Sequence, residues 1–362
     1  MNNTKIVTTF IVVTSICLIA FIVSSCNESQ STISDTISQQ EFSPEASELV
    51  VKGGGNLVEV TTGHDHDANL HTFDLNIDKV PEGWTRFQLT NATHADHFFL
   101  LYEVPEAAID AASNANQSVL DHWYDTVTYP FQTEWNPYFE GSIGWGTFVN
   151  NLFGAVLSSA PWFPDAVIMG GPGITAAGTT SQTTVYLEEG LYIAECYVKD
   201  ENGEFHSFNG MLAMLEVTGE TSKEREPRAT MKVSISSQQG IEHPESVRPG
   251  KHTVAINYED QAIYGHLVGH NVQLVRFDDG YDSALLSELE AWMDWSDPDA
   301  FIDNSPEGTT FLGGAMEMTE GSTAYYTVNL KPGTYAWIAE VPDASEKNML
   351  KTFSVPFGRN MK

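Results

Sequence analysis

Apolar and polar positions alternate along several short stretches of the chain, and this pattern predicts β-strands. In residues 191–198, LYIAECYV, one face of the predicted strand holds every second residue: Tyr192, Ala194, Cys196 and Val198. Such stretches are separated by turns rich in Gly and Pro, which favours two-sheet antiparallel sandwiches. Two segments depart from the alternation, residues 105–127 and 283–295, and their sequences have helical character.

The strand pattern occurs twice. The 30-residue segments that begin MGGPGITAAG at Met169 and LGGAMEMTEG at Leu312 align without a gap and share a double Gly and a Gly-x-Tyr strand. An earlier pair, VPEGWTRFQLTN and VRPGKHTVAIN, precedes a His and an apolar strand in each copy. The repeat predicts two domains of one topology, residues 56–219 and 229–358, joined by the charged stretch GETSKEREPRA.

Length and composition agree with two globular domains. The chain has 362 residues, of which 41% are hydrophobic, enough for two cores. Against 49 Asp and Glu stand 17 Lys and Arg, and the net charge of -32 repels phosphate backbones, so we expect no nucleic-acid partner. Solubility in a saline medium and docking to a cationic envelope protein both remain open as reasons for this acidity.

The N-terminus predicts export. Lys5 precedes an apolar run that ends in VSSC at Cys26, which indicates a signal peptide over residues 1–25. VSSC resembles a bacterial lipobox, which implies cleavage before Cys26 and lipidation of its thiol. An uncleaved anchor is the alternative, because the run approaches the roughly 18 apolar residues that can span a bilayer. Either way we expect a membrane-anchored protein on the periplasmic or cell-surface side, with residues 26–55 as a flexible tether.

Cysteine use leaves a single thiol in the mature fold. Cys17 lies in the signal peptide and Cys26 at the lipidation point, so Cys196 has no partner for a disulfide within the chain. Such an odd thiol is buried as a small apolar group, pairs between chains, or is used chemically. The segment CYVKDENGEFHSFNGM places this thiol near one imidazole and one thioether, those of His206 and Met211.

The order of these features resembles the cupredoxin family. A Gly-rich turn and a strand that ends in Asn lead to a His before an apolar strand, then to GLYIAEC, a second His and Gly-Met. The resemblance covers most of residues 56–219 and, more weakly, 229–358. It implies an all-β fold of two tandem cupredoxin-like Greek-key β-sandwiches with short helical insertions. It also implies one type 1 copper ion, in the first domain.

The resemblance implies four copper ligands, two imidazoles and a thiolate in a trigonal plane and a weak axial thioether: His97, Cys196, His206 and Met211. A soft thiolate binds both copper oxidation states, so the site would serve one-electron transfer with a redox partner. His94 is a rival to His97, which we prefer because the apolar strand starts directly after it. The second domain keeps His270 but has Ala339 in the position of the Cys, so we expect it to be metal-free.

The spacing between Cys196 and His206 leaves two interpretations open. A tight two-residue turn at Asn202 and Gly203 would pair His206 with Lys199, which points away from the face of Cys196. The chain would then be a metal-free tandem β-sandwich that binds another envelope component. An irregular loop that turns His206 towards Cys196 instead favours copper binding and electron transfer.

Further patterns bear on catalysis and on metal ions. We find no motif for hydrolysis or phosphate binding, and no second His-rich copper cluster, so an electron carrier or binding protein is favoured over an enzyme. The segment GHDHDANLH, residues 63–71, could hold a divalent ion loosely, although a solvated segment is the simpler interpretation. We expect the tryptophans of the longer insertion to cover an open sandwich end: Trp123, Trp135, Trp145 and Trp162.

Overall fold

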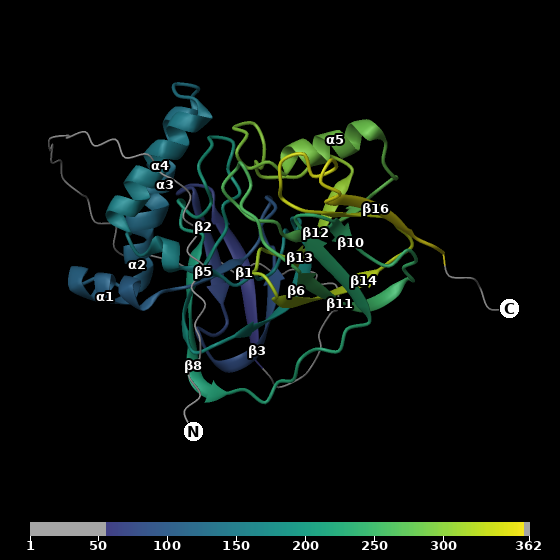
Figure 1. Ribbon diagram of the computed structural model, residues 1–362, viewed down its shortest axis with the longest axis horizontal. Coiled ribbons are helices and arrows are strands. Elements are labelled where there is room, and N and C mark those ends of the chain that lie inside the picture. Colours follow the sequence, from purple (N-terminus) through teal and green to yellow (C-terminus); the bar gives the residue numbers. More distant parts are fainter. Residues whose placement is uncertain (1–55, 358–362) are drawn as a thin grey trace. The chain divides into compact units, whose positions relative to one another are not determined.

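The structure is a computed structural model, and it describes residues 56–357. The predicted signal peptide, Cys26 and the tether over residues 26–55 lie outside the described residues. Within the described range the chain forms mainly strands, with helices inserted between them (Figure 1). No helix among residues 56–357 is long and apolar enough to cross a bilayer.

The first half of the fold contains eight strands in two sheets. One sheet has the order β2-β1-β3-β6 and the other β5-β4-β7-β8, and only β1 and β3 are parallel neighbours within them. The start of β3 also pairs with β8, which joins the two sheets at one edge. The strands are β1 (Leu57–Asp65), β2 (Leu70–Leu75), β3 (Lys79–Thr90), β4 (Leu100–Glu103), β5 (Val167–Ile168), β6 (Thr180–Leu187), β7 (Gly190–Glu195) and β8 (Leu212–Thr221).

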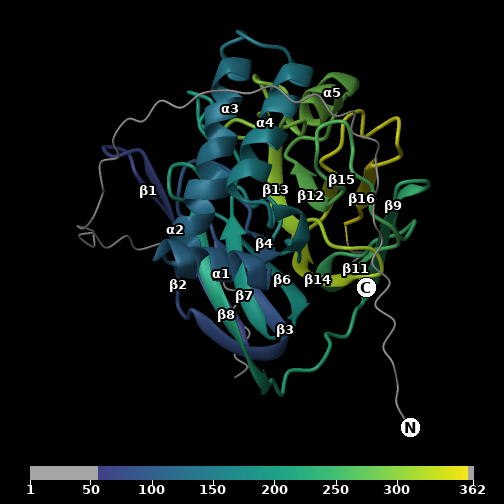
Figure 2. The same ribbon diagram turned by 60° about the vertical axis from the view of Figure 1, so that its left-hand side comes forward.

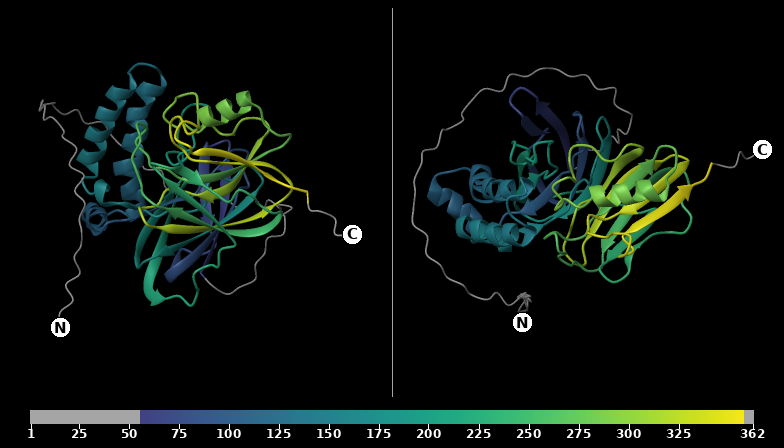
Figure 3. Two further views of the ribbon diagram at one scale, coloured as in Figure 1. Left: turned by 45° about the vertical axis from the view of Figure 1, so that its right-hand side comes forward. Right: turned by 90° about the horizontal axis from the view of Figure 1, so that it is seen from above.

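The second half repeats this arrangement strand for strand. Its sheets have the orders β10-β9-β11-β14 and β13-β12-β15-β16, again with one parallel pair, β9 and β11. Strand β14 pairs with β6, so one sheet of each half continues into the other (Figure 3). The strands are β9 (Met231–Ser236), β10 (Gly240–Glu242), β11 (Gly250–Tyr258), β12 (Val272–Phe277), β13 (Thr309–Ala315), β14 (Thr323–Leu330), β15 (Gly333–Ile338) and β16 (Leu350–Val355).

The strands follow the alternation of the sequence. In β3, Phe87 and Leu89 are buried, and Gln88 between them is partly exposed. Tyr192, Ala194 and Cys196 are all buried, as the predicted inward face of β7 requires. The alternation is clear in β3, whereas β6 and β7 are buried on both faces, and Cys196 lies within the core of the first half.

Helices occupy both segments where helical character was predicted, and two more complete the long insertion. Helices α3 and α4 run side by side (Figure 2). The helices are α1 (Glu106–Ala115), α2 (Val119–Trp123), the π-helix η1 (Tyr124–Thr128), α3 (Tyr129–Phe139), α4 (Trp145–Ser159), the 3₁₀-helix η2 (Phe163–Asp165) and α5 (Ser283–Trp292).

Three of the four tryptophans that were expected to cover the sandwich pack inward, and Trp145 is partly exposed. Trp123, Trp135 and Trp162 are buried, and the ring of Trp135 lies 5.2 Å from the ring of Phe205 and 5.6 Å from that of Trp295. These contacts cover the loop that follows β7. The predicted fold class is confirmed for residues 56–357, which form two tandem β-sandwiches of matching strand order with helical insertions.

Candidate metal centre

A capped turn shapes the loop between β7 and β8. The N–H of Gly203 donates to the carbonyl of Asp200 at 3.0 Å, and the carboxylate of Asp200 accepts from the N–H groups of Asn202 and Glu204 at 2.8 and 2.9 Å. Gly203 has a φ of 78°, in the left-handed region that favours Gly. The side chain of Asp200 thereby replaces the backbone pairs that a regular hairpin would form.

The turn sets the register of His206. Lys199 is bridged to Phe205, and the N–H of His206 donates to the carbonyl of Val198 at 2.8 Å. The tight turn at Asn202 and Gly203 therefore does not form, and His206 lies opposite Val198, which shares the face of Cys196. A shift of one residue moves a side chain to the other face of a strand pair, so this register brings His206 to the thiol.

Three of the four expected ligands converge. Nδ1 of His97 lies 3.7 Å from Sγ of Cys196 and 3.1 Å from Nδ1 of His206, while Sγ lies 3.9 Å from Nδ1 of His206. All three side chains are fully buried. The residues come from the segment before β4 and from the loop after β7, so the strand order of the first half places them together.

The triangle of donor atoms fits a metal ion of the first transition series. Zinc, an ion of comparable size, binds imidazole nitrogen at about 2.0 Å and thiolate sulfur at about 2.3 Å. The separations of 3.1 to 3.9 Å between the donor atoms would allow all three residues to hold one ion at such distances. The donor set of one thiolate and two imidazoles also matches copper.

A hydrogen bond on the far side of the His97 ring fixes the position of its proton. The hydroxyl of Thr93 donates to Oδ1 of Asn91 at 2.9 Å, so it accepts from Nε2–H of His97 at 2.7 Å. The proton at Nε2 leaves the lone pair of Nδ1 of His97 available on the side of Cys196. Nε2 of His206 lies 3.6 Å from Oδ1 of Asp303, beyond hydrogen-bond distance, and has no hydrogen-bond partner within residues 56–357.

Burial sets the protonation of these groups. It lowers the pKa of His97 well below its usual value, and it lowers the pKa of His206 although the carboxylate of Asp303 acts in the other direction. Burial raises the pKa of the Cys196 thiol to about 12. Both imidazoles are therefore neutral near pH 7, and the thiol would bind a cation as the thiolate.

Met211 is tied to the ligand loop through its backbone. Its N–H donates to the carbonyl of His206 at 2.8 Å, and its carbonyl accepts from the N–H of Cys196 at 3.4 Å. The side chain is fully buried. His94 is exposed, with its ring 5.6 Å from that of His66, and it does not join the converging residues.

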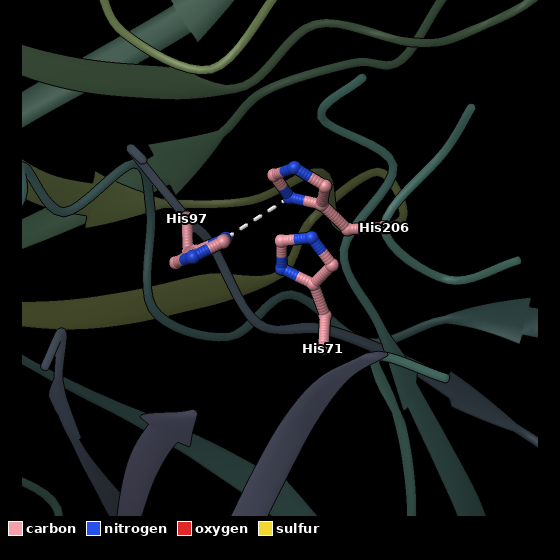
Figure 4. Close-up of side chains that lie close together, drawn as sticks. All are labelled: His71, His97 and His206. Atoms are coloured by element: carbon pink, nitrogen blue, oxygen red, sulfur yellow. Dashed lines mark hydrogen bonds between the residues drawn. The ribbon is translucent and has the colours of Figure 1, made fainter. Parts of the chain in front are cut away.

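A further histidine, His71 of β2, lies at the site, where the sequence analysis placed only a loose ion or a solvated segment. Its ring stacks on that of His206 at 4.1 Å, and one nitrogen from each of His71, His97 and His206 lies within 4.8 Å of the others (Figure 4). Burial and the neighbouring imidazoles lower the pKa of His71 to about 2. The signal for this residue was the GHDHDANLH segment, but nothing in its spacing connects it to Cys196.

The corresponding His of the second half is satisfied within the protein. Nε2 of His270 lies 2.9 Å from the carbonyl of Asp260, and Nδ1 lies 3.2 Å from the hydroxyl of Tyr264. Ala339 is buried at the position that corresponds to Cys196. The absence of a metal ion from this half stays a prediction.

No protein-family model matches this chain, and no curated protein does. It is similar to the solved structure of dithionite-reduced auracyanin from Roseiflexus castenholzii, with 13% identity and a TM-score of 0.24, over 35% of this chain and 95% of that chain. It is also similar to a copper nitrite reductase from Nitrosomonas europaea, with 10% identity and a TM-score of 0.22, over 84% of this chain and 94% of that chain. These TM-scores are too low to support a conclusion about the site. The chemistry of the site is therefore inferred from its own side chains.

Proposed function

We propose that this chain is a copper-binding, one-electron carrier with a single type 1 copper ion in the first half. The observation that carries the proposal is the triangle formed by Nδ1 of His97, Sγ of Cys196 and Nδ1 of His206, with edges of 3.1 to 3.9 Å. Met211 is the axial ligand in this proposal. The observed register of His206 supports it over a metal-free binding module.

Copper, when bound, supplies a couple that exchanges one electron. The protein holds the thiolate and both imidazoles in a fixed arrangement, because Thr93 orients His97 and the capped turn orients His206. Ligands that keep their positions in both oxidation states lower the reorganisation that electron transfer requires. Burial of all four residues excludes water and substrate, which favours electron transfer over catalysis at the ion.

A visible spectrum tests this function. Purified protein loaded with Cu(II) is expected to take up one ion and to absorb strongly in the visible, and Cys196→Ser is expected to abolish the band. His94→Ala is the matched control, since this exposed imidazole lies outside the triangle. Failure to bind copper, or a band that survives in Cys196→Ser, rejects the proposal in favour of a metal-free tandem β-sandwich.

We also propose that a lipid on Cys26 holds the protein at the membrane of the cell envelope, with a cationic envelope protein as redox partner. VSSC after the apolar run supports the anchor, and the net charge of -32 supports the partner. Cys26→Ser is expected to lose incorporation of labelled fatty acid. Undiminished labelling of this variant would refute the anchor.

A further inference from the structure

A row of imidazole rings connects the surface to the candidate metal centre. Along the β1–β2 hairpin, the ring of His66 lies 4.1 Å from that of His64, and the ring of His64 stacks on that of His71 at 4.0 Å. His71 in turn stacks on His206 at 4.1 Å. Adjacent rings are thus in contact at each step from the hairpin turn to a proposed ligand.

Exposure falls along the same row. His66 is exposed and His64 is half-buried, whereas His71 is 2% exposed and His206 is fully buried. Cys196 is also fully buried, so an ion in solvent has no direct contact with the proposed ligands. The row provides imidazole nitrogens at every depth between solvent and that site.

The nitrogens of the row are free to bind a cation. Within residues 56–357, neither ring nitrogen of His71 has a hydrogen-bond partner, and neither does Nε2 of His64. Buried polar groups without partners are rare in folded proteins and call for an explanation. Neutral imidazole is a good ligand for copper.

The hairpin is fixed to the ligand loop. The N–H of His71 donates to the carbonyl of Asn209 at 2.7 Å, and the side chain of Asn69 donates to the carboxylates of Asp200 and Glu204 at 3.2 and 3.3 Å. Asp200 is the residue that caps the turn before His206. Asp200 therefore both caps the turn before His206 and binds the hairpin that carries the row of histidines.

The outer end of the row is acidic. Asp65 and Asp67 flank His66, and both are exposed. An acidic surface raises the local concentration of cations. This end of the hairpin is therefore suited to attract a copper ion from solution.

We propose that His66, His64 and His71 form an uptake path along which copper ions pass from solvent to the buried ligands. The path rests on the proposed function, because it requires a copper site at its inner end. Each ring would bind the ion weakly in turn, and His97, Cys196 and His206 would bind it last. His71, within 4.8 Å of His97 and His206, is the final donor before the site.

Uptake kinetics test the path. The apo form of the whole protein is mixed with Cu(II), the growth of the visible band is followed by stopped flow, and bound copper is counted by metal analysis. His66→Ala and His64→Ala are each expected to slow uptake about tenfold, which corresponds to about 1.4 kcal/mol. Both variants are expected to reach the wild-type spectrum and one ion per chain, since neither residue belongs to the triangle. His252→Ala, which removes a partly exposed imidazole of the second half, is the matched control.

The outcomes separate the path from the site. If the wild type gains no copper band, the proposed function fails and the path fails with it. If the wild type gains the band and both hairpin variants load at the wild-type rate, the path is overturned while the site stands. Equal slowing in His252→Ala also overturns the path, because it would show a general effect of losing an imidazole. Slowing confined to the hairpin variants supports the proposal.

Discussion

Nε2 of His206 lies 3.6 Å from Oδ1 of Asp303, so a carboxylate of the second half reaches a proposed ligand of the first half. The N–H of Asp303 donates to the carbonyl of Lys199 at 2.8 Å, and its carbonyl accepts from the N–H of Asp96 at 2.7 Å. These bonds fix the backbone of Asp303 against the loop that carries His206. The second half therefore helps to orient the candidate site.

Asp303→Asn is expected to weaken copper binding. The substitution keeps the size of the side chain and removes its charge, and the loss of such an outer partner costs about 10–100-fold in metal affinity. The reduction potential is expected to rise, because a nearby negative charge favours Cu(II). Competition with a chelator and a redox titration measure both effects. Asp299→Asn, an exposed carboxylate nearby, is the control, and equal effects in both variants would contradict the role of Asp303.

Sequence patterns predict the features of the fold that depend on local periodicity, such as the inward face of a strand. The alternation around Cys196 predicts its inward face because side chains in a strand have a period of two. The repeat predicts matching strand orders because equivalent sequences form equivalent strands. The face of His206 could not be predicted in this way, since it depends on a register shift of one residue. Capping by Asp200 and packing of the loop decide that shift.

The parts that the sequence did not predict depend on contacts between distant segments. His71 reaches the site because its backbone pairs with Asn209, far along the chain, and the periodicity of β2 does not reveal this pairing. Asp303 belongs to the other half. Helices α3 and α4 were also not predicted, and aromatic contacts such as that between Trp135 and Trp295 tie the insertion to the second half.

Gly203→Ala is expected to destabilise the ligand loop. A methyl group at this position would lie 2.5 Å from Cδ2 of Phe139, and φ is 78°. Left-handed backbone costs a non-Gly residue about 1–2 kcal/mol, and the steric conflict adds about 1–3 kcal/mol. Gly178→Ala is the control, because φ there is 71° but no atom lies within 4 Å of the added carbon. Urea unfolding measures both variants, and equal losses would show that packing against Phe139 is unimportant.

A buried carboxyl cluster lies behind the ligand loop. The hydroxyl of Tyr197, next to Cys196, lies 3.5 Å from Oε1 of Glu317 and 3.1 Å from Oε2 of Glu340. The side chain of Asn271 donates to Oε2 of Glu340 at 3.1 Å. Both carboxyl groups are buried, and burial is the main cause that raises the pKa of Glu317 to about 7. Burial therefore favours the protonated form of these carboxyl groups.

This cluster predicts a loss of stability as pH rises. A carboxyl group whose pKa is raised by folding binds its proton more tightly in the folded state, so stability falls between its unfolded pKa near 4.5 and its folded pKa near 7. The slope is at most about 1.4 kcal/mol per pH unit for one group. Glu317→Gln is expected to reduce the difference in unfolding free energy between pH 5 and pH 8 by about 1–3 kcal/mol.

Urea unfolding at pH 5 and pH 8 measures that difference. Glu320→Gln, an exposed carboxyl three residues further along, serves as the control for loss of a charge from the same segment. If Glu317→Gln keeps the full pH dependence of the wild type, the raised pKa of Glu317 does not control stability in this range.

Met211→Leu is expected to change the reduction potential and to leave copper bound. Met211 is fully buried, and its backbone bonds to His206 and Cys196 are independent of its side chain. A weak axial thioether tunes a type 1 site more than it holds the ion, and its loss favours Cu(I). We expect the potential to rise by at least about 59 mV, a tenfold change in a one-electron equilibrium.

A redox titration measures the reduction potential, and metal analysis measures the bound copper. Met214→Leu, which changes an exposed methionine of β8, is the control. Loss of copper from Met211→Leu, or an equal shift in the control, would argue against Met211 as the axial ligand.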